Sequence, residues 1–281
     1  MIKAAPVTVV DLLQIVDIRT KIVSLSSLAI GTSYAVYTTH AFSIGLFVAM
    51  LLATLLVDMG TTGFNSYYDF LHGVDTVDTD AEKSKALVQR GIEPAVALRL
   101  SWFLFVLAAA LGLVIGALVD WRIVLVGGAC MTVALLYSGG PVPIARLPVG
   151  EIFAGGLLGL VLIATILSVN NACDIEGDAK AGRRTVAILL GRDNAERVIH
   201  LQAAVTLLLG YALVPLRVLP VSALLPMTLA GLFGWRELAR MHRRGFSHRT
   251  KAPSMGGISA VFVVYTLAIL VAIGMGASGL P

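Results

Sequence analysis

Charged side chains are scarce in this sequence, at 14% of residues, whereas about a quarter of an ordinary soluble domain is charged. Hydrophobic residues make up 57% of the chain, and the mean hydropathy is +0.88. An ordinary soluble domain is therefore excluded. Because a backbone in lipid must satisfy its own hydrogen bonds, this composition predicts an all-α fold, a polytopic transmembrane helical bundle.

Cysteine is nearly absent as well. Cys130 falls inside an apolar segment and Cys173 inside a polar one, and neither has the spacing of a metal ligand, so a thiolate metal site and a disulfide are not expected. No basic stretch precedes a short apolar core at the N-terminus, so we expect no signal peptide. The net charge of +4 does not indicate nucleic-acid binding, because the cations fall in loops where the positive-inside bias explains them.

The apolar residues fall into eight segments that follow an amphipathic helix, which we expect over about residues 5–18 at the membrane interface. The segments are about 22–38, 44–64, 95–118, 123–138, 149–169, 198–216, 221–236 and 255–278. We interpret residues 1–281 as a single integral-membrane domain. Its halves, about 1–145 and 146–281, are expected to be internal repeats.

A polar motif follows the apolar run that ends at residue 169. Asn170, Asp174 and Asp178 recur every four residues, so a continuing helix would stack them on one face. Lys180, Arg183 and Arg184 come just beyond. Carboxylate and amide oxygens are ligands that Mg²⁺ prefers, and the cations suit phosphate oxygens. The alternative is an ordinary solvated turn at a helix end.

An earlier copy of this spacing favours the functional interpretation. By their order in the chain, we call Asn65–Asp69 the first motif and Asn170–Asp178 the second motif. Asn65 and Asp69 repeat the four-residue interval of Asn170 and Asp174, again where an apolar segment closes. Asp58, inside the same segment, is costly in lipid and should face the bundle interior. Tyr67 and Tyr68 could face a substrate cavity or form part of an interfacial aromatic belt.

Topology leaves one conflict. The basic residues of 236–251 are expected to form a loop on the cytoplasmic side, which we interpret as a topology signal. Counting crossings from the N-terminus, and counting back from that loop, leaves a single segment, 149–169, between loop 139–148 and the second motif. One crossing there would put the two motifs on opposite faces. A re-entrant hairpin would keep them together, but about 21 residues suffice for only one full crossing.

At these motifs the sequence resembles the UbiA superfamily of intramembrane aromatic prenyltransferases, and most of all the branch that uses 1,4-dihydroxy-2-naphthoate in menaquinone biosynthesis. The resemblance is carried by Ile18-Arg19-Thr20-Lys21, Gly31-Thr32, Asn65-Ser-Tyr-Tyr-Asp69 with Gly73 and Asp75, Tyr137-Ser-Gly-Gly-Pro141 with Gly150-Glu151, and Asn170-Asn171-Ala-Cys-Asp174 with Asp178, Gly182, Arg184-Thr185 and Leu190-Gly191. It implies nine helices around a central cavity.

The chain departs from the family pattern in two places. Ser66 stands where many members carry a second acidic residue, and only about 18 residues separate Glu151 from Asn170, where the family usually has two spans.

The resemblance implies Mg²⁺-dependent transfer of a polyprenyl group from its diphosphate to an aromatic acceptor. The implied catalytic residues are Asp69, Asp174 and Asp178, and these three with Asn65 and Asn170 would hold the metal. The implied substrate-binding residues are Lys21, Asn65, Tyr68, Asp75, Asn170, Asn171, Lys180, Arg183 and Arg184. Lys21 could instead be a membrane-interface anchor, and the expected location is the cell membrane, with the active-site loops on the cytoplasmic side.

Two alternatives stay open. The acceptor could be 4-hydroxybenzoate or a lipid, and the chain could be a non-catalytic protein that binds or transports a lipid diphosphate, since polar stripes at span ends also serve transporters.

Overall fold

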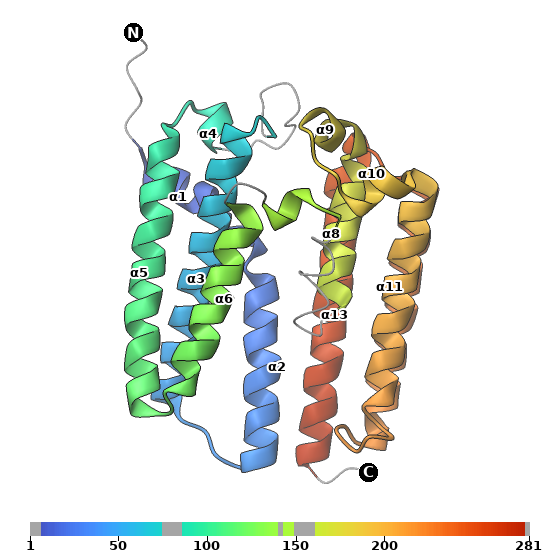
Figure 1. The fold of residues 1–281 in the computed structure, drawn as a ribbon. Helices are drawn as coiled ribbons and strands as arrows, with labels where there is room; N and C mark the ends of the chain where they lie inside the picture. Colours follow the sequence, from blue (N-terminus) through green and yellow to red (C-terminus); the bar gives the residue numbers. More distant parts are fainter. Residues whose placement is uncertain (1–6, 75–85, 140–142, 149–160, 279–281) are drawn as a thin grey trace. The chain divides into compact units, whose positions relative to one another are not determined.

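The computed structural model describes residues 7–74, 86–139, 143–148 and 161–278 (Figure 1). Every regular element in these ranges is a helix, so the predicted all-α class is confirmed. The chain divides into two compact units, one of Met1–Leu25 with Ser43–Ile144 and one of Ser26–Phe42 with Ala145–Pro281. The internal repeat of the two halves stays a prediction.

Helices dominate the first unit. They are α1 (Val9–Ile15), the 3₁₀ turn η1 (Ile18–Thr20), α3 (Ile44–Leu71), α4 (Ala86–Gln89), α5 (Pro94–Leu118) and α6 (Arg122–Ser138). The expected interfacial helix over 5–18 is thus two pieces, because Asp17 adopts a left-handed conformation with φ of 41° between them. The first motif also lies within α3, which continues to Leu71, rather than at its end.

Small residues let α3 and α5 approach closely. A Cβ at Gly60 would come within 2.4 Å of the Phe105 ring, and one at Gly63 within 2.3 Å of the Ser101 hydroxyl. The Phe64 side chain fills the adjacent space and meets Phe105 edge to face, with ring centroids 5.1 Å apart. Small residues at contacts are how membrane helices pack without a hydrophobic driving force between them. This contact fixes the stretch of α3 that leads into Asn65.

The second unit contains most of α2 (Ile22–Thr39) and the elements of the C-terminal half of the chain. These are α8 (Val161–Cys173), α9 (Ile175–Lys180), α10 (Val186–Leu190), α11 (Arg192–Ala212), the 3₁₀ turn η3 (Val221–Ala223), α12 (Leu224–Arg244), the 3₁₀ turn η4 (His248–Thr250) and α13 (Lys251–Ala277). Another 3₁₀ turn, η2 (Ile144–Arg146), covers the boundary between the units.

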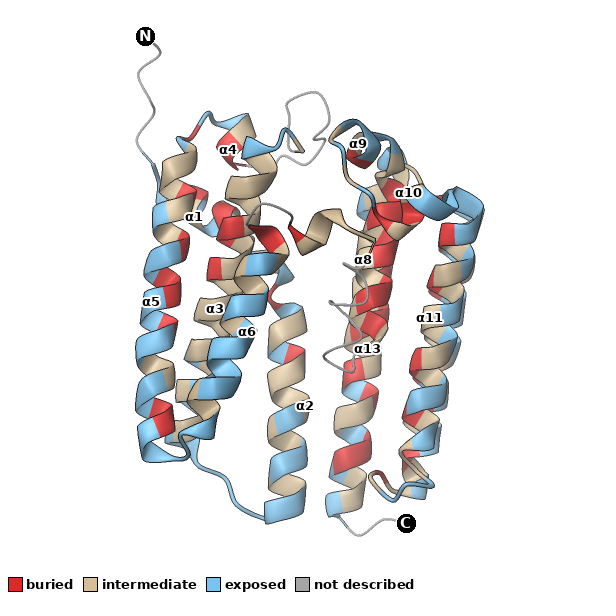
Figure 2. Cartoon of the chain, in the orientation of Figure 1, coloured by how far each residue is buried: buried red, intermediate tan, exposed pale blue. Residues whose placement is uncertain are grey.

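Helix α13 packs against α8 and α12, and Figure 2 shows buried residues, in red, where α8 and α13 overlap in the view. The core at its far end joins Met227, Ala272 and Ile273 to Tyr37 of α2. The cluster therefore joins α2 to the C-terminal helices within the second unit.

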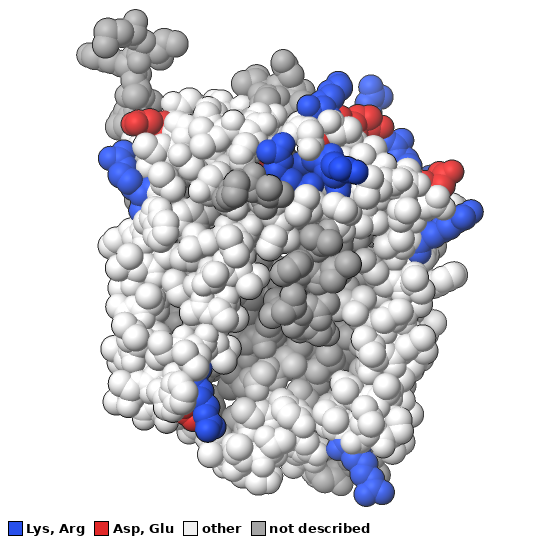
Figure 3. Space-filling model, in the orientation of Figure 1, with Lys and Arg blue, Asp and Glu red and all other residues white. Residues whose placement is uncertain are grey.

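Three described helices are long and apolar enough to span a membrane, namely Ile44–Leu71, Pro94–Leu118 and His248–Ala277, and Arg122–Ser138 and Val161–Cys173 are shorter apolar helices. Charged side chains gather near helix ends on the face drawn in Figure 3. Segment 149–169 is the one whose membrane crossing was in conflict. Its residues 149–160, which include Glu151, lie outside the described ranges.

The interpretation of 236–251 as a loop is wrong. Helix α12 runs to Arg244 and carries Arg240 and Arg243 on its last turns, so only a short connection separates it from α13. Arginine is a good helix former, and basic side chains in a last turn interact favourably with the helix C-terminus, so charged residues alone do not end a helix.

Candidate functional site

The first motif sits on one face of the unbroken helix α3. Asn65 donates a hydrogen bond from Nδ2 to Oδ2 of Asp69 at 2.7 Å, as residues four apart on a helix can. Ser138, the last residue of α6, donates to Oδ1 of Asn65 at 3.4 Å. The amide is thereby oriented with its oxygen toward a hydroxyl and its nitrogen toward the carboxylate.

Aromatic rings surround this motif. Tyr68 meets Tyr67 edge to face at 5.1 Å and stacks on His72 at 6.1 Å between ring centroids. It also covers Gly139, where a Cβ would come within 2.6 Å of the ring. Tyr68 is therefore fixed by packing, and His72 takes part as a ring partner. Asp75, which the sequence assigned to the substrate site, lies outside the described residues.

Lys21 is buried and paired with Asp58. Its Nζ lies 2.6 Å from Oδ1 of Asp58 and donates to the Thr62 hydroxyl at 2.7 Å, and its side chain is 3% exposed. Ser24 also donates to Asp58. The prediction that Asp58 points away from lipid is consistent with these polar partners. The Lys21 ammonium therefore forms an ion pair with Asp58, which lies two helical turns before Asn65.

The second motif bends the chain where the sequence predicted a continuing helix. Helix α8 ends at Cys173, Asp174 has φ −112° and ψ 18°, and α9 begins at Ile175. Asp178 still reaches back through its backbone N–H to the Asp174 carbonyl at 2.9 Å. The expected single stripe of Asn170, Asp174 and Asp178 is thus interrupted at its middle residue.

Basic side chains contact both carboxylates of this motif. Lys251 Nζ lies 2.6 Å from Oδ2 of Asp174, and His248 Nδ1 lies 3.0 Å from Oδ1. Arg183 contacts Oδ1 of Asp178 at 3.3 Å, and both side chains are largely buried. Charge-assisted contacts of this kind are the strong class of hydrogen bond.

The remaining predicted residues of this unit differ in exposure. Asn170 is half-buried and Asn171 is buried, whereas Lys180 and Arg184 are exposed. The Arg184 backbone N–H donates to the Arg146 carbonyl at 2.8 Å, and the Arg146 guanidinium donates to the Ala181 carbonyl at 2.7 Å. Arg146 therefore holds the turn after α9 in place.

Sequence reasoning missed Lys251, His248 and Arg146. For Lys251 and His248 a signal was present, because the sequence places basic residues just before the last apolar segment, but the positive-inside bias explained those residues equally well. For Arg146 the partners are backbone carbonyls, which no side-chain pattern reveals.

The donor chemistry of both motifs fits a hard divalent cation, since Asp and Asn oxygens are what Mg²⁺ prefers. Among the described ranges, no three His, Cys, Asp or Glu side chains are already gathered in a way that could hold a metal. Lys251, His248 and Arg183 contact the carboxylates of the second motif. A metal bound at Asp174 would have to replace such partners.

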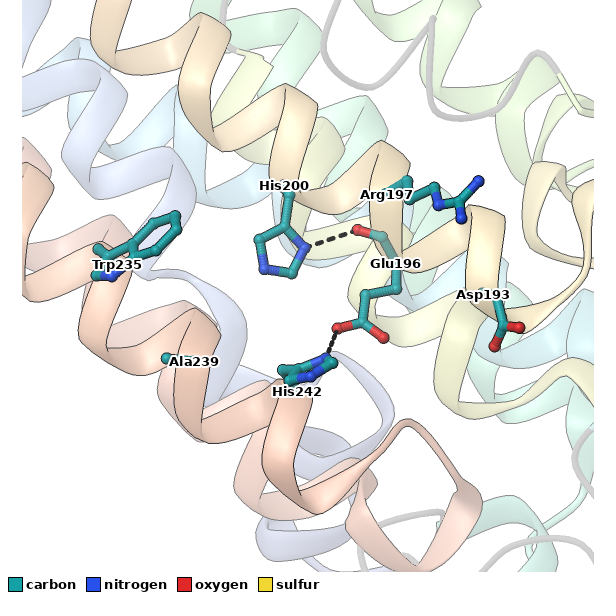
Figure 4. Close-up of a pocket in the computed structure, with 7 residues that line it drawn as sticks. All are labelled: Asp193, Glu196, Arg197, His200, Trp235, Ala239 and His242. Carbon is teal, nitrogen blue, oxygen red and sulfur yellow. Dashed lines mark hydrogen bonds and ion pairs between the residues drawn. The ribbon is translucent and has the colours of Figure 1, made fainter.

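A pocket of about 620 Å³ lies between α11 and α12 of the second unit (Figure 4). Glu196 occupies its centre, with its carboxylate 2.6 Å from Nδ1 of His242 and its carbonyl 2.9 Å from Nδ1 of His200. Trp235 and Arg197 also line it, and none of the predicted ligands does.

The sequence profile of the UbiA prenyltransferase family matches residues 24–166 and 152–263, which together cover most of the chain. The chain therefore belongs to the UbiA prenyltransferase family, and the resemblance seen in the sequence is confirmed.

The chain is also similar to an individual enzyme of the family. The chain is 35% identical over 186 residues to the 1,4-dihydroxy-2-naphthoate octaprenyltransferase of Bacillus subtilis, a match that covers 57% of this chain and 60% of that protein. The chain thus aligns with about three fifths of the length of this curated relative.

Two solved structures share the fold. A UbiA homolog from Aeropyrum pernix matches with a TM-score of 0.65 at 19% identity, covering 90% of this chain and 96% of that one. A UbiA homolog from Archaeoglobus fulgidus, bound to DMAPP and Mg²⁺, matches with a TM-score of 0.60 at 19% identity over 92% and 99% of the two chains. At this identity the likeness establishes the fold.

Proposed function

We propose that this protein transfers a prenyl group from a prenyl diphosphate to 1,4-dihydroxy-2-naphthoate. In this reaction the bond between the first prenyl carbon and the diphosphate oxygen breaks, and diphosphate leaves. A naphthoate ring carbon forms the new carbon–carbon bond, and its carboxylate departs as carbon dioxide. Family membership and the naphthoate-using relative support this choice of donor and acceptor.

The observation that carries the proposal is the arrangement around Asp174 and Asp178. Two carboxylates at the end of an apolar helix lie within hydrogen-bonding or ion-pairing distance of Lys251 and Arg183. Diphosphate leaves only when its negative charge is neutralised, so a site for it needs cations close to carboxylates that can share a metal. Magnesium, when bound, would supply that neutralisation as a Lewis acid.

Each residue has a role under this proposal. Asn65, Asp69, Asn170, Asp174 and Asp178 supply oxygen ligands, and Arg183 contacts the diphosphate. Tyr67 and Tyr68 present aromatic faces, which stabilise the positive charge that develops on the prenyl carbon and exclude water from it. Lys180 and Arg184, which are exposed, would attract the anionic donor from solution.

The test is an assay with purified protein, Mg²⁺, a polyprenyl diphosphate and 1,4-dihydroxy-2-naphthoate. We expect a prenylated quinol as product, and a loss of more than about 100-fold in rate for Asp69→Asn and for Asp174→Asn, because each removes a charged metal ligand. Asp120→Asn is the matched control, since Asp120 accepts a hydrogen bond from the Arg122 N–H through an oxygen that asparagine retains. Product formation that is unaffected by either motif variant would refute the proposal.

The proposal also assigns both motifs to one substrate and to the cytoplasmic side of the cell membrane. Cysteines placed at the exposed positions His72 and Lys180, in a background with Cys130→Ala and Cys173→Ala, would report their sides to an impermeant thiol reagent. We expect both to be labelled from the same side. Labelling from opposite sides would exclude a shared diphosphate.

A further inference from the structure

Asp174 is contacted by two side chains that come from about 75 residues further along the chain. Lys251 Nζ contacts Oδ2 at 2.6 Å, and His248 Nδ1 contacts Oδ1 at 3.0 Å. Both carboxylate oxygens are thus engaged. The Asp174 and Lys251 side chains are 16% and 19% exposed, so the pair is shielded from most of the solvent.

The fold holds Lys251 in this position. Gly245, with φ of 71°, ends α12, and Phe246 next to it is 2% exposed and anchors the connection. Ser247 and Thr250 form a capping box, and the Thr250 hydroxyl also donates to the Gly245 carbonyl at 2.7 Å. Lys251 then opens α13. Its contact with Asp174 is therefore set by ordered backbone on both sides.

Lys251 and a divalent cation need the same carboxylate. A half-buried carboxylate is stabilised by a positive partner, and the ammonium of Lys251 supplies one charge at Oδ2. A metal ligated by that oxygen would displace the ammonium. Because lysine carries its charge on a flexible four-carbon stem, the displaced group can swing to a nearby anion while its backbone stays fixed.

We propose that Lys251 neutralises Asp174 while the metal is absent and transfers to the diphosphate when the metal-bound donor enters. This inference rests on the proposed function. It assigns one residue two partners in turn, first as a positioning residue for Asp174 and then as a diphosphate contact. Lys251 would therefore weaken the binding of the metal alone and strengthen the binding of the metal and diphosphate together.

The two roles predict shifts of opposite sign in Lys251→Met. Mn²⁺, which accepts the same oxygen ligands as Mg²⁺, serves as a spectroscopic probe. We expect Mn²⁺ alone to bind about five- to tenfold more tightly to the variant, because a competing ion pair is gone. Inorganic pyrophosphate, added at saturating Mn²⁺, should bind about tenfold more weakly, and Lys251→Arg should restore most of that loss.

Arg249→Met is the matched control, because Arg249 is an exposed cation two residues away. We expect it to leave both affinities unchanged. If Lys251→Met does not fold, Lys251→Gln keeps a hydrogen bond to Asp174 without the charge, and the same pair of shifts is expected in smaller measure. Weaker binding of both probes, or no change in either, would overturn the inference, since damage to the site cannot tighten metal binding.

The failure of the inference can be distinguished from failure of the proposed function. If the unmodified protein binds Mn²⁺ and pyrophosphate and Asp174→Asn abolishes both, the site is as proposed, whatever Lys251 does. If the unmodified protein binds neither probe, both proposals fall together.

Discussion

The two acidic motifs share a spacing but differ in how the protein holds them. The first lies on an unbroken helix, where Asp69 accepts from the Asn65 amide and Tyr68 packs against Gly139. The second lies at a helix break, and its carboxylates contact Lys251 and Arg183. In the first unit the buried cation Lys21 pairs two turns away, with Asp58.

The difference indicates a division of labour. A carboxylate that is already paired with a basic side chain, as Asp174 is, can exchange that partner for a metal ion. A carboxylate that accepts a hydrogen bond from an amide on the same helix, as Asp69 does, offers a metal ion a ligand in a fixed position. Under the proposed function, the first motif sets geometry and the second exchanges charge.

The largest expected effect tests whether the Lys21 cation stabilises the first unit or contacts substrate. Removing one partner of a buried ion pair strands the other, so Lys21→Met should lower the free energy of unfolding by about 3 kcal/mol. The double variant Lys21→Met with Asp58→Leu should recover most of this loss, because no buried charge remains. Unfolding of the purified protein by dodecyl sulfate in mixed micelles measures both.

The same variants distinguish the substrate role that the sequence allowed for Lys21. A structural ion pair predicts that the double variant regains pyrophosphate binding together with stability. Stable protein that has lost pyrophosphate binding would instead mean that Lys21 contacts the donor, and the contrast between the two motifs would disappear.

Much of the fold was predictable because long apolar segments in the sequence strongly favour membrane-spanning helices. The apolar segments 22–38, 95–118 and 123–138 became α2, α5 and α6 with ends shifted by one residue or less. Ends set by polar residues were predicted poorly. Helix α3 continued through Asn65 and Asp69, and α12 continued through its arginines, because a helix persists wherever its polar residues have interfacial water or partners.

The site was predictable where its members share one element and not where they come from elsewhere. The pairing of Asn65 with Asp69 follows from a four-residue interval on a helix. The contact of Lys251 with Asp174 depends on how α13 packs against α8, a long-range fact that no interval in the sequence encodes. The break at Asp174 was missed for a different reason, because the four-residue spacing of Asn170, Asp174 and Asp178 suggested a continuous helix.

The next largest effect concerns the steric support of the first motif. A Cβ at Gly139 would lie 2.6 Å from the Tyr68 ring and 3.1 Å from the Leu135 carbonyl, so Gly139→Ala must displace one of them. We expect a loss of about 2 kcal/mol in unfolding free energy and weaker pyrophosphate binding. Gly128→Ala on α6 is the matched control, since its Cβ would meet nothing within 4 Å and alanine favours helix. Equal stability of the two variants would show that packing around Tyr68 is loose.

A smaller effect compares the two motifs directly. Asp69→Asn keeps an oxygen that can accept from Asn65, so its stability should change by less than about 1 kcal/mol. Asp174→Asn leaves Lys251 facing a neutral amide and should cost about 1 kcal/mol more. Concentrated salt should narrow this difference, because it screens a partly exposed pair. Equal losses in the two variants would mean that the cation does not distinguish the motifs.

The smallest effect concerns Asp11, which joins α1 to Arg90 in the first unit. The Thr8 hydroxyl donates to Oδ2 at 2.7 Å and the Thr8 N–H at 2.8 Å, and with Arg90 they hold the pKa of Asp11 below its ordinary value of 3.8. A lowered pKa in the folded protein adds stability above pH 3.8, and this stability is lost as the pH falls from there through the folded value. Asp11→Asn should therefore be less stable than the unmodified protein near neutral pH and converge with it in acid.

Two further variants separate the causes of this pH dependence. The hydrogen bond from the Thr8 side chain is the largest single cause that lowers the pKa of Asp11, so we expect Thr8→Val to flatten the acid dependence of unfolding more than Arg90→Gln does. The reverse order would make the ion pair the main anchor of α1. The first unit would then depend on an ion pair, as the second motif does. The two units would differ only in how they hold their acidic motifs.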